Sequence, residues 1–167
     1  EKTLNIISEK TVTCMSAVPK MIYDYSQITF AENVLSKLKF LLIGGDVINQ
    51  NHYNYLKRNK INAYISYGAT ETSSSVVGYW IYKQKEYLRG FLGVAHPNVK
   101  LTIKDGCINI KSNTVMKKYC GSPLANNIYR STDKAEIISN NVCFVGRDVH
   151  QIVSGGENIN LQYIQNH

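Results

Sequence analysis

Two short apolar segments with a helical pattern between them constrain the fold of this chain most strongly. Residues 39–43 and 61–66 have the length and continuity of buried strands. Between them, residues 48–59 place apolar or aromatic side chains at helical spacing. A strand–helix–strand order predicts neighbouring parallel strands joined by a right-handed crossover. We therefore expect an α/β fold in which Gly44 and Tyr67, which follow these strands, lie at the same edge of a parallel sheet.

From about residue 90 the pattern changes to short alternating segments, which are typical of antiparallel strands. Asp-Gly is a strong hairpin turn signal, and an Asn-Asn pair is compatible with a second turn. We expect a small, distorted antiparallel β-barrel in this half. Two hairpins are predicted: residues 99–103 and 107–111 around Asp105-Gly106, and residues 135–138 and 142–145 around Asn140-Asn141.

The chain is expected to have three parts. An α/β sheet subdomain takes residues 1–92, the small β-barrel takes residues 93–148, and a hinge with the start of a C-terminal lid subdomain takes residues 149–167. Smaller elements are predicted around them: a helix end at 4–7, a strand at 12–15, a helix at 18–25, a short helix or loop at 28–36, and a strand followed by a helix within 152–167.

Composition narrows the class of protein. The chain of 167 residues is 44% hydrophobic and 19% charged, as in a globular domain. It has no apolar run of about 18 residues and no signal peptide pattern, so we expect no membrane span. Its four cysteines and four histidines form no zinc spacing, which favours reduced cysteines and a cytoplasmic location.

The net charge of +7 would suit a polyanionic ligand such as ATP or CoA. The basic side chains are scattered, and the densest groups, at residues 57–60 and 117–118, are interpreted as solvated faces. We expect no nucleic-acid partner. Peripheral membrane association would follow if the substrate were a fatty acid.

Residues 67–72, Tyr-Gly-Ala-Thr-Glu-Thr, combine four chemical groups that a nucleotide site needs. The ring of Tyr67 can stack on a flat base, and Gly68 lets the backbone approach a ligand. The hydroxyl of Thr70 can bind a phosphate oxygen, and the carboxylate of Glu71 can hold Mg²⁺. The alternative is an ordinary polar loop after a strand.

Two further segments join this one in a recognisable order. Residues 41–46 are an apolar run that ends in a glycine pair, and residues 144–147 lead into a Ser-Gly-Gly-Glu-Asn-Ile run at 154–159. With residues 67–72, the chain resembles the adenylate-forming superfamily of acyl- and aryl-CoA ligases, luciferases and adenylation domains of peptide synthetases. The run at 154–159 is most similar to o-succinylbenzoate-CoA and fatty-acyl-CoA ligases. The resemblance extends from about Val18 to the end.

The resemblance implies roles for individual residues. Gly44, Gly45 and Asp46 would pass along the adenine, on which Tyr67 would stack, and Gly68 and Ala69 would belong to the same nucleotide site. The alternatives are a turn that ends a strand and a buried structural tyrosine. Thr70 and Glu71 would be catalytic, Thr70 by binding the α-phosphate and Glu71 by holding Mg²⁺.

Further residues complete the expected site. Asp133 would bind both ribose hydroxyls, with a carboxylate at the edge of a hairpin as the alternative. The family motif Thr-Gly-Asp is here Ser131-Thr132-Asp133, so a threonine replaces the glycine. Arg147 would contact ribose or phosphate, and Val149 stands where the family has a hinge aspartate or lysine. Gly155, Gly156 and Glu157 would form the lid loop that faces the site during thioester formation.

The implied reaction joins a small-molecule carboxylate to AMP with Mg-ATP and then transfers the acyl group to CoA. The alternatives are the adenylation domain of a peptide synthetase or carrier-protein ligase, and a degenerate, non-catalytic remnant. The chain starts at Glu1 and contains neither the family's Ser/Thr/Gly-rich phosphate loop nor its Gly-Lys catalytic lysine. We therefore expect a middle fragment that adenylates poorly or not at all and binds AMP about as well as ATP.

Overall fold

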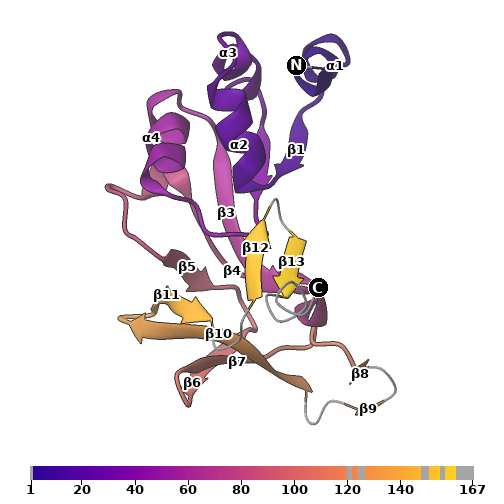
Figure 1. Cartoon of the computed structure of the whole chain (residues 1–167), viewed down its shortest axis with the longest axis vertical. Helices are drawn as coiled ribbons and strands as arrows, with labels where there is room; N and C mark the ends of the chain where they lie inside the picture. The colour runs from indigo at the N-terminus through magenta and orange to yellow at the C-terminus, as the bar shows by residue number, and fades with distance from the viewer. Residues whose placement is uncertain (1, 120–121, 124–126, 148–150, 155–156, 161–167) are drawn as a thin grey trace. The chain divides into compact units, whose positions relative to one another are not determined.

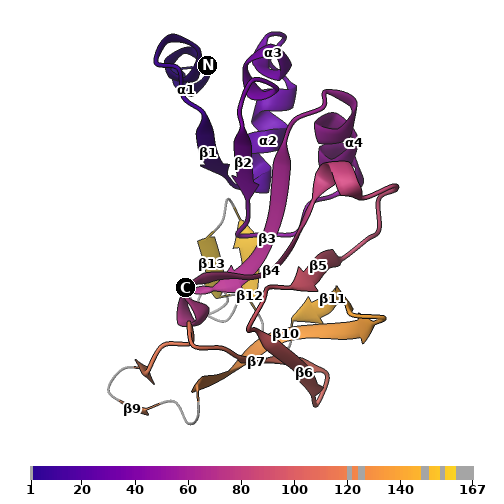
Figure 2. The same cartoon turned by 180° about the vertical axis from the view of Figure 1, so that it is seen from behind.

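The computed structural model describes residues 2–119, 122–123, 127–147, 151–154 and 157–160 (Figures 1 and 2). The chain forms two compact units. Unit 1 comprises residues 1–66, 79–89 and 155–157, and unit 2 comprises residues 67–78, 90–154 and 158–167. No helix in the described ranges is long and apolar enough to cross a membrane.

The four α-helices of the described ranges all lie before residue 60, and strands dominate the rest of the chain. The helices are α1 (Lys2–Glu9), α2 (Pro19–Ser26), α3 (Ala31–Leu35), α4 (Gln50–Arg58) and the 3-10 turns η1 (Thr70–Thr72) and η2 (Ile81–Lys83). The strands are β1 (Cys14–Ala17), β2 (Phe40–Ile43), β3 (Ala63–Ala69), β4 (Ser74–Trp80), β5 (Phe91–Ala95), β6 (Lys100–Lys104), β7 (Cys107–Lys111), β8 (Lys118–Tyr119), β9 (Ser122–Pro123), β10 (Ile128–Ile138), β11 (Asn141–Arg147), β12 (Gln151–Ser154) and β13 (Glu157–Asn160).

The parallel strands of unit 1 confirm the strand–helix–strand prediction. β2 pairs in parallel with β1 on one side and with β3 on the other, with Ile43 opposite Ala17 and Ile65. Alternate residues of β2 and β3 are fully or almost fully buried, and they join one core cluster with side chains of α1–α4. Figure 1 shows these helices beside the strands. Gly44 and Ser66 follow the paired residues Ile43 and Ile65, so they lie at the same, carboxyl edge of these parallel strands.

Helix α4 begins at Gln50, two residues later than the apolar pattern indicates, because Asn49 caps it. The Asn49 side chain accepts a hydrogen bond from the backbone N–H of His52 at 3.0 Å. In return, the backbone N–H of Asn49 donates to His52 Nδ1 at 3.2 Å. This reciprocal pair satisfies two donors that a helix start otherwise leaves free. Burial lowers the pKa of His52, in keeping with the neutral ring that this bond requires.

The two hairpins of unit 2 form, one as predicted and one with a shifted turn. β6 and β7 pair around Asp105 and Gly106, whose φ angles of 52° and 77° fit the left-handed turn that an Asp-Gly pair favours. In the β10–β11 hairpin, the turn residues are Ser139 and Asn140, with φ angles of 49° and 68°. Asn141 instead pairs with Ile138. The prediction of an Asn140-Asn141 turn was wrong by one residue.

The antiparallel half is an open sheet, which corrects the predicted barrel. The nine strands of the sheet run in the order β1-β2-β3-β4-β5-β11-β10-β7-β6. Within the described ranges, β6 is hydrogen-bonded to β7 alone and forms an edge. A barrel would require β6 to find a second partner. The α/β class, with a parallel part followed by an antiparallel part, is confirmed (Figure 2).

The region after β11 differs from the predicted strand and helix. β12 and β13 form a separate two-stranded sheet, so residues 157–160 are extended rather than helical. Of the expected hinge and lid at 149–167, residues 149–150, 155–156 and 161–167 lie outside the described residues.

A buried hydroxyl in the core of unit 1 gives the first testable prediction. Tyr55 Oη is buried without a hydrogen-bond partner in the described part of the chain, and burial raises the pKa of Tyr55 to about 12. We expect Tyr55→Phe to stabilise the protein by about 1 kcal/mol, because it removes an unsatisfied polar group. The free energy of unfolding in urea measures this effect.

Tyr53 provides the matched control on the same helix. Its hydroxyl donates to the carbonyl oxygen of Gln84 at 2.9 Å. Tyr53→Phe removes that hydrogen bond and should destabilise the protein by about 1 kcal/mol. Equal changes in the two variants would show that the hydroxyl of Tyr55 is satisfied.

Candidate functional site

A buried carboxylate with two side-chain partners is the centre of the candidate site in unit 2. Asp133 on β10 lies directly opposite Arg147 on β11. Arg147 Nε donates to Asp133 Oδ1 at 2.5 Å. On the other side, the hydroxyl of Tyr67 donates to Asp133 Oδ2 at 2.9 Å. Each oxygen of this carboxylate therefore has a separate donor, from β3 and from β11.

The backbone of β10 fixes the position of Asp133 further. The hydroxyl of Ser131 accepts a hydrogen bond from the backbone N–H of Asp133 at 3.1 Å. Ser131 and Asp133 are buried, whereas Thr132 between them is exposed. Since side chains alternate along a strand, the extra Cβ of Thr132 points away from the face that bears Asp133. The threonine that stands where the Thr-Gly-Asp pattern has a glycine therefore does not crowd the Asp133 carboxylate.

Tyr67 is a neutral donor in this arrangement. Burial raises the pKa of the Tyr67 phenol well above its ordinary value of 10, and the negative charge of Asp133 raises it further. The hydroxyl proton therefore stays in place across the physiological range, where it can be donated to the carboxylate. The Tyr67 side chain thus presents two groups, an aromatic ring and a hydroxyl, and the hydroxyl is already hydrogen-bonded to Asp133.

The segment after Tyr67 consists of Gly68 and Ala69, which end β3, and the tight turn η1. A Cβ atom on Gly68 would lie 1.7 Å from the carbonyl oxygen of Ser74, so only glycine fits there. Thr72 closes the turn, because its hydroxyl accepts from the backbone N–H of Ala69 at 3.0 Å and donates to the carbonyl of Ser74 at 2.9 Å. Ser73 has φ 56° and ψ 45°, a left-handed conformation that is uncommon outside glycine. These contacts hold η1 in one conformation.

The predicted catalytic residues Thr70 and Glu71 lie on η1. Thr70 is exposed and Glu71 is half-buried, and the backbone carbonyl of Glu71 accepts from the N–H of Met116 at 2.8 Å. No group of three or more potential metal ligands occurs among the described residues. A single carboxylate fits Mg²⁺ that arrives with a nucleotide, because such ions keep phosphate and water ligands. The donor set here therefore suits a metal–nucleotide complex.

The glycine pair of unit 1 follows β2. The backbone N–H of Gly44 donates to the carbonyl of Ala17 at 3.2 Å. A Cβ on Gly44 would lie 3.2 Å from the carbonyl oxygen of Ser66, a tight contact. Gly45 has φ 87°, a conformation that favours glycine. The carboxylate of Asp46 accepts from the backbone N–H of Val47 at 2.7 Å, so it stabilises its own turn.

The structure thus places the predicted site residues in two groups. The group in unit 1 consists of Gly44, Gly45 and Asp46, and Glu157 is described only as the first residue of β13. Gly155 and Gly156 lie outside the described residues. The group in unit 2 consists of Tyr67, Gly68, Ala69, Thr70, Glu71, Asp133 and Arg147.

Some features of the site were missed by sequence reasoning. The Tyr67–Asp133 hydrogen bond joins residues that are 66 positions apart, and no local pattern signals it. Ser131 and Thr72 lie next to predicted residues, and their hydroxyls hold the backbone there. Small hydroxyl residues beside a motif are the signal that could have found them.

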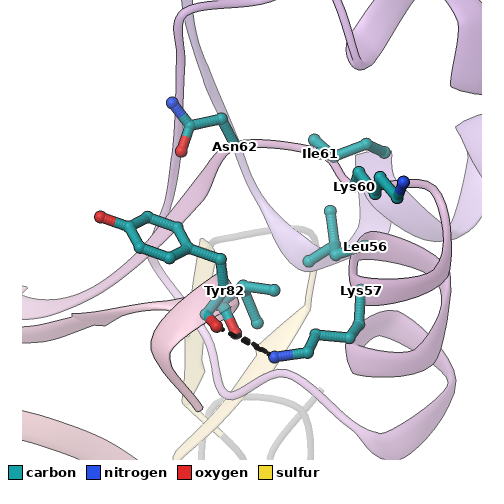
Figure 3. A pocket seen from close by; sticks show the side chains of 7 residues that line it. Leu56, Lys57, Lys60, Ile61, Asn62 and Tyr82 are labelled. Carbon is teal, nitrogen blue, oxygen red and sulfur yellow. Dashed lines mark hydrogen bonds between the residues drawn. The ribbon is translucent and has the colours of Figure 1, made fainter. Parts of the chain in front are cut away.

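A cavity of about 360 Å³ lies elsewhere, in unit 1 (Figure 3). It is at the amino end of β3, opposite the edge that bears Gly44, and no predicted site residue lines it. Lys57 of α4 donates to the backbone carbonyls of Ile81, Tyr82 and Gln84 at 2.5–3.2 Å and so fixes η2 beside the cavity. The cavity is lined by Leu56, Lys57, Lys60, Ile61, Asn62, Ile81 and Tyr82.

Comparison with known proteins points to one family. The family model described as "AMP-binding enzyme" matches residues 1–120. A comparison with curated proteins finds no match.

Solved structures share the fold at low sequence identity. o-Succinylbenzoate-CoA synthetase from Bacillus subtilis, as a double mutant bound to a product analogue, has a TM-score of 0.84 at 24% identity, over 95% of this chain and 36% of that one. The same enzyme in complex with ATP and magnesium ion has a TM-score of 0.78 at 24% identity, with the same coverage of 95% and 36%. PA1221, a peptide synthetase protein with adenylation and carrier domains, has a TM-score of 0.80 at 17% identity, over 98% of this chain and 39% of that one. The chain thus spans between 36% and 39% of the length of these structures.

Proposed function

Because this chain belongs to the family of AMP-binding enzymes, we propose that it is the middle part of an ATP-dependent acid–thiol ligase. The ligase activates a small-molecule carboxylate as its acyl-adenylate and then transfers the acyl group to CoA. The observation that supports this function best is the Asp133 carboxylate held between Tyr67 and Arg147. It offers a fixed, buried anion to a ribose diol.

In the proposed reaction, some residues bind the nucleotide and others stabilise the transition state. The substrate carboxylate attacks the α-phosphorus of ATP, a bond to the α-phosphate forms, and pyrophosphate leaves. The hydroxyl of Thr70 hydrogen-bonds the α-phosphate, and Glu71 holds the Mg²⁺ that neutralises charge on the phosphates. Both effects stabilise charge that develops in the transition state. Asp133 and Tyr67 bind the nucleoside, which places the α-phosphorus for in-line attack.

Several residues of the proposed site complete this assignment. For Gly44, Gly45 and Asp46 we propose the adenine contact that the resemblance implies, and for Arg147 a contact with ribose or phosphate in addition to its bond with Asp133. For Gly155, Gly156 and Glu157 we propose the part in the thioester step that the resemblance implies; of these, the structure describes Glu157, at the start of β13. CoA is proposed as the acceptor because the run at 154–159 resembles that of CoA ligases. A carrier protein is the alternative acceptor, and the fold is compatible with both.

Nucleotide binding tests the proposal directly. We expect this chain to bind AMP, and we expect Asp133→Ala to weaken that binding about ten- to a hundredfold, because hydrogen bonds to a charged group are worth about 1.5–3 kcal/mol. Isothermal calorimetry with AMP, ATP and an acyl-adenylate mimic measures the affinities of the unmodified chain and of Asp133→Ala. The exposed Asp24, which pairs with Lys20 on α2, provides the control Asp24→Ala, and this variant should bind AMP as the unmodified chain does.

The outcomes separate the alternatives. An AMP affinity that Asp133→Ala leaves unchanged would contradict the assignment of the ribose site. Failure of the chain to bind AMP, ATP and the mimic would favour a degenerate remnant. Binding of ATP that is much tighter than binding of AMP would contradict the expectation that both bind about equally.

A further inference from the structure

We propose that the hydroxyl of Tyr67 is a positioning group that fixes the Asp133 carboxylate in the orientation that receives a ribose diol. This inference rests on the proposed function, since it assigns a second role to a residue of the nucleotide site. The ring of Tyr67 would face the base, and its hydroxyl would act on the sugar through Asp133.

The Asp133 carboxylate has more acceptor positions than its two donors use. An ionised carboxylate has about four lone-pair positions. In this structure Arg147 Nε uses one on Oδ1, and the Tyr67 hydroxyl uses one on Oδ2. At least one position on each oxygen is not used by these two donors. A diol presents two adjacent hydroxyl donors, so its geometry matches one free position on each oxygen.

The Asp133 side chain would be free to rotate if it had a single partner. The terminal torsion of an aspartate is broad, so an aspartate with one partner can turn its carboxylate plane. Arg147 fixes Oδ1, and the hydrogen bond that the backbone N–H of Asp133 donates to the Ser131 hydroxyl fixes the backbone of Asp133. The Tyr67 hydroxyl is the donor that fixes Oδ2. Without it, we expect the plane to rotate about the end that Arg147 holds, and the two free positions then no longer face one ligand.

The Tyr67 hydroxyl comes from a different segment of the chain than the carboxylate and the guanidinium. Tyr67 belongs to β3, whereas Asp133 and Arg147 belong to the β10–β11 hairpin. The carboxylate is therefore oriented by two separate segments of unit 2. The hydroxyl remains protonated because burial and the charge of Asp133 raise the pKa of Tyr67. The donor is thus permanent over the physiological pH range.

The variant Tyr67→Phe separates the two roles, because it keeps the ring and removes the hydroxyl. We expect it to weaken AMP binding about five- to tenfold, and to leave binding of 2′,3′-dideoxy-AMP unchanged, because that ligand has no hydroxyls for Asp133. Calorimetry or a fluorescence displacement assay gives, for each ligand, the ratio of the affinity of Tyr67→Phe to that of the unmodified chain. The exposed Tyr82 of unit 1 provides the control Tyr82→Phe, for which neither affinity should change.

Two results would overturn the inference. An equal loss of affinity for AMP and the dideoxy ligand would mean that the hydroxyl acts on packing or on the base. An AMP affinity that Tyr67→Phe leaves unchanged would mean that Arg147 alone orients the Asp133 carboxylate. If the unmodified chain binds neither ligand, the proposed function fails, and the positioning role is decided by a measurement without ligand.

That measurement is the orientation of the Asp133 side chain in Tyr67→Phe, from a crystal structure or from NMR couplings. We expect one carboxylate orientation in the unmodified chain and more than one in the variant. A single, unchanged orientation in Tyr67→Phe would refute the positioning role whether or not nucleotide binds.

Discussion

Replacing Gly68 by alanine is expected to destabilise the protein by about 3 kcal/mol or more, the upper end of the usual cost of forcing atoms into a packed region. The added Cβ would lie 1.7 Å from the carbonyl oxygen of Ser74, 2.4 Å from its carbonyl carbon and 2.9 Å from the backbone nitrogen of Ser75. All three atoms are backbone, so no side chain can rotate away. Relief requires the turn between β3 and β4 to open.

The free energy of unfolding in urea measures this cost, and Gly146 provides a matched control. A Cβ on Gly146 would meet no atom within 4 Å. Gly146→Ala should therefore change the free energy of unfolding by no more than about 0.5 kcal/mol. If Gly68→Ala were as stable as Gly146→Ala, the turn would be able to open at little cost, and the close approach at Gly68 would not define it.

The same substitution bears on the proposed catalytic residues. Thr70 and Glu71 follow Gly68 within the turn that Thr72 closes. A turn that opens to admit the Cβ displaces both side chains from the positions that a phosphate and its metal would require. In Gly68→Ala, we therefore expect loss of any binding of ATP that depends on Mg²⁺, even where the protein remains folded.

The parallel unit could be predicted from sequence because its signals are local and strong. The apolar strands are short and end at glycine or a polar turn, and the helix between them has a regular pattern. The Asp105-Gly106 turn was predicted for the same reason, since the conformation of a tight turn is decided by the residues within it. The Asn140-Asn141 turn was misplaced because serine and asparagine at 139–141 all tolerate the turn.

Features that depend on distant pairing could not be predicted. β3 continues through Tyr67, Gly68 and Ala69, which local signals placed in a loop, because hydrogen bonding within the sheet overrides the weak strand preference of glycine and alanine. The open sheet depends on whether β6 finds a second strand, and nothing in its own sequence decides this. For the site, the motif residues were identified by resemblance. The contact between Tyr67 and Asp133 required the fold.

The second large effect is expected at the buried ion pair of the candidate site. Asp133→Ala leaves the guanidinium of Arg147, which is 25% exposed, without its carboxylate partner. It also leaves the hydroxyl of Tyr67 without its acceptor. Removing one member of a largely buried pair costs about 3 kcal/mol. We expect this loss in the free energy of unfolding of the chain without ligand, so the carboxylate serves stability as well as the proposed binding.

A double-mutant cycle isolates the interaction of the pair. Arg147→Ala alone leaves the Asp133 carboxylate buried with fewer donors, and the double variant should be more stable than the sum of the single effects predicts, by about 1–3 kcal/mol. The exposed pair of Arg130 and Asp105, with side chains 52% and 67% exposed, provides the comparison. Its coupling, from Arg130→Ala and Asp105→Asn, should be about 0.5 kcal/mol, because solvent screens the charges. Equal couplings in the two cycles would show that solvent reaches Asp133 freely, and a freely solvated carboxylate would not be the pre-oriented ribose acceptor that we propose.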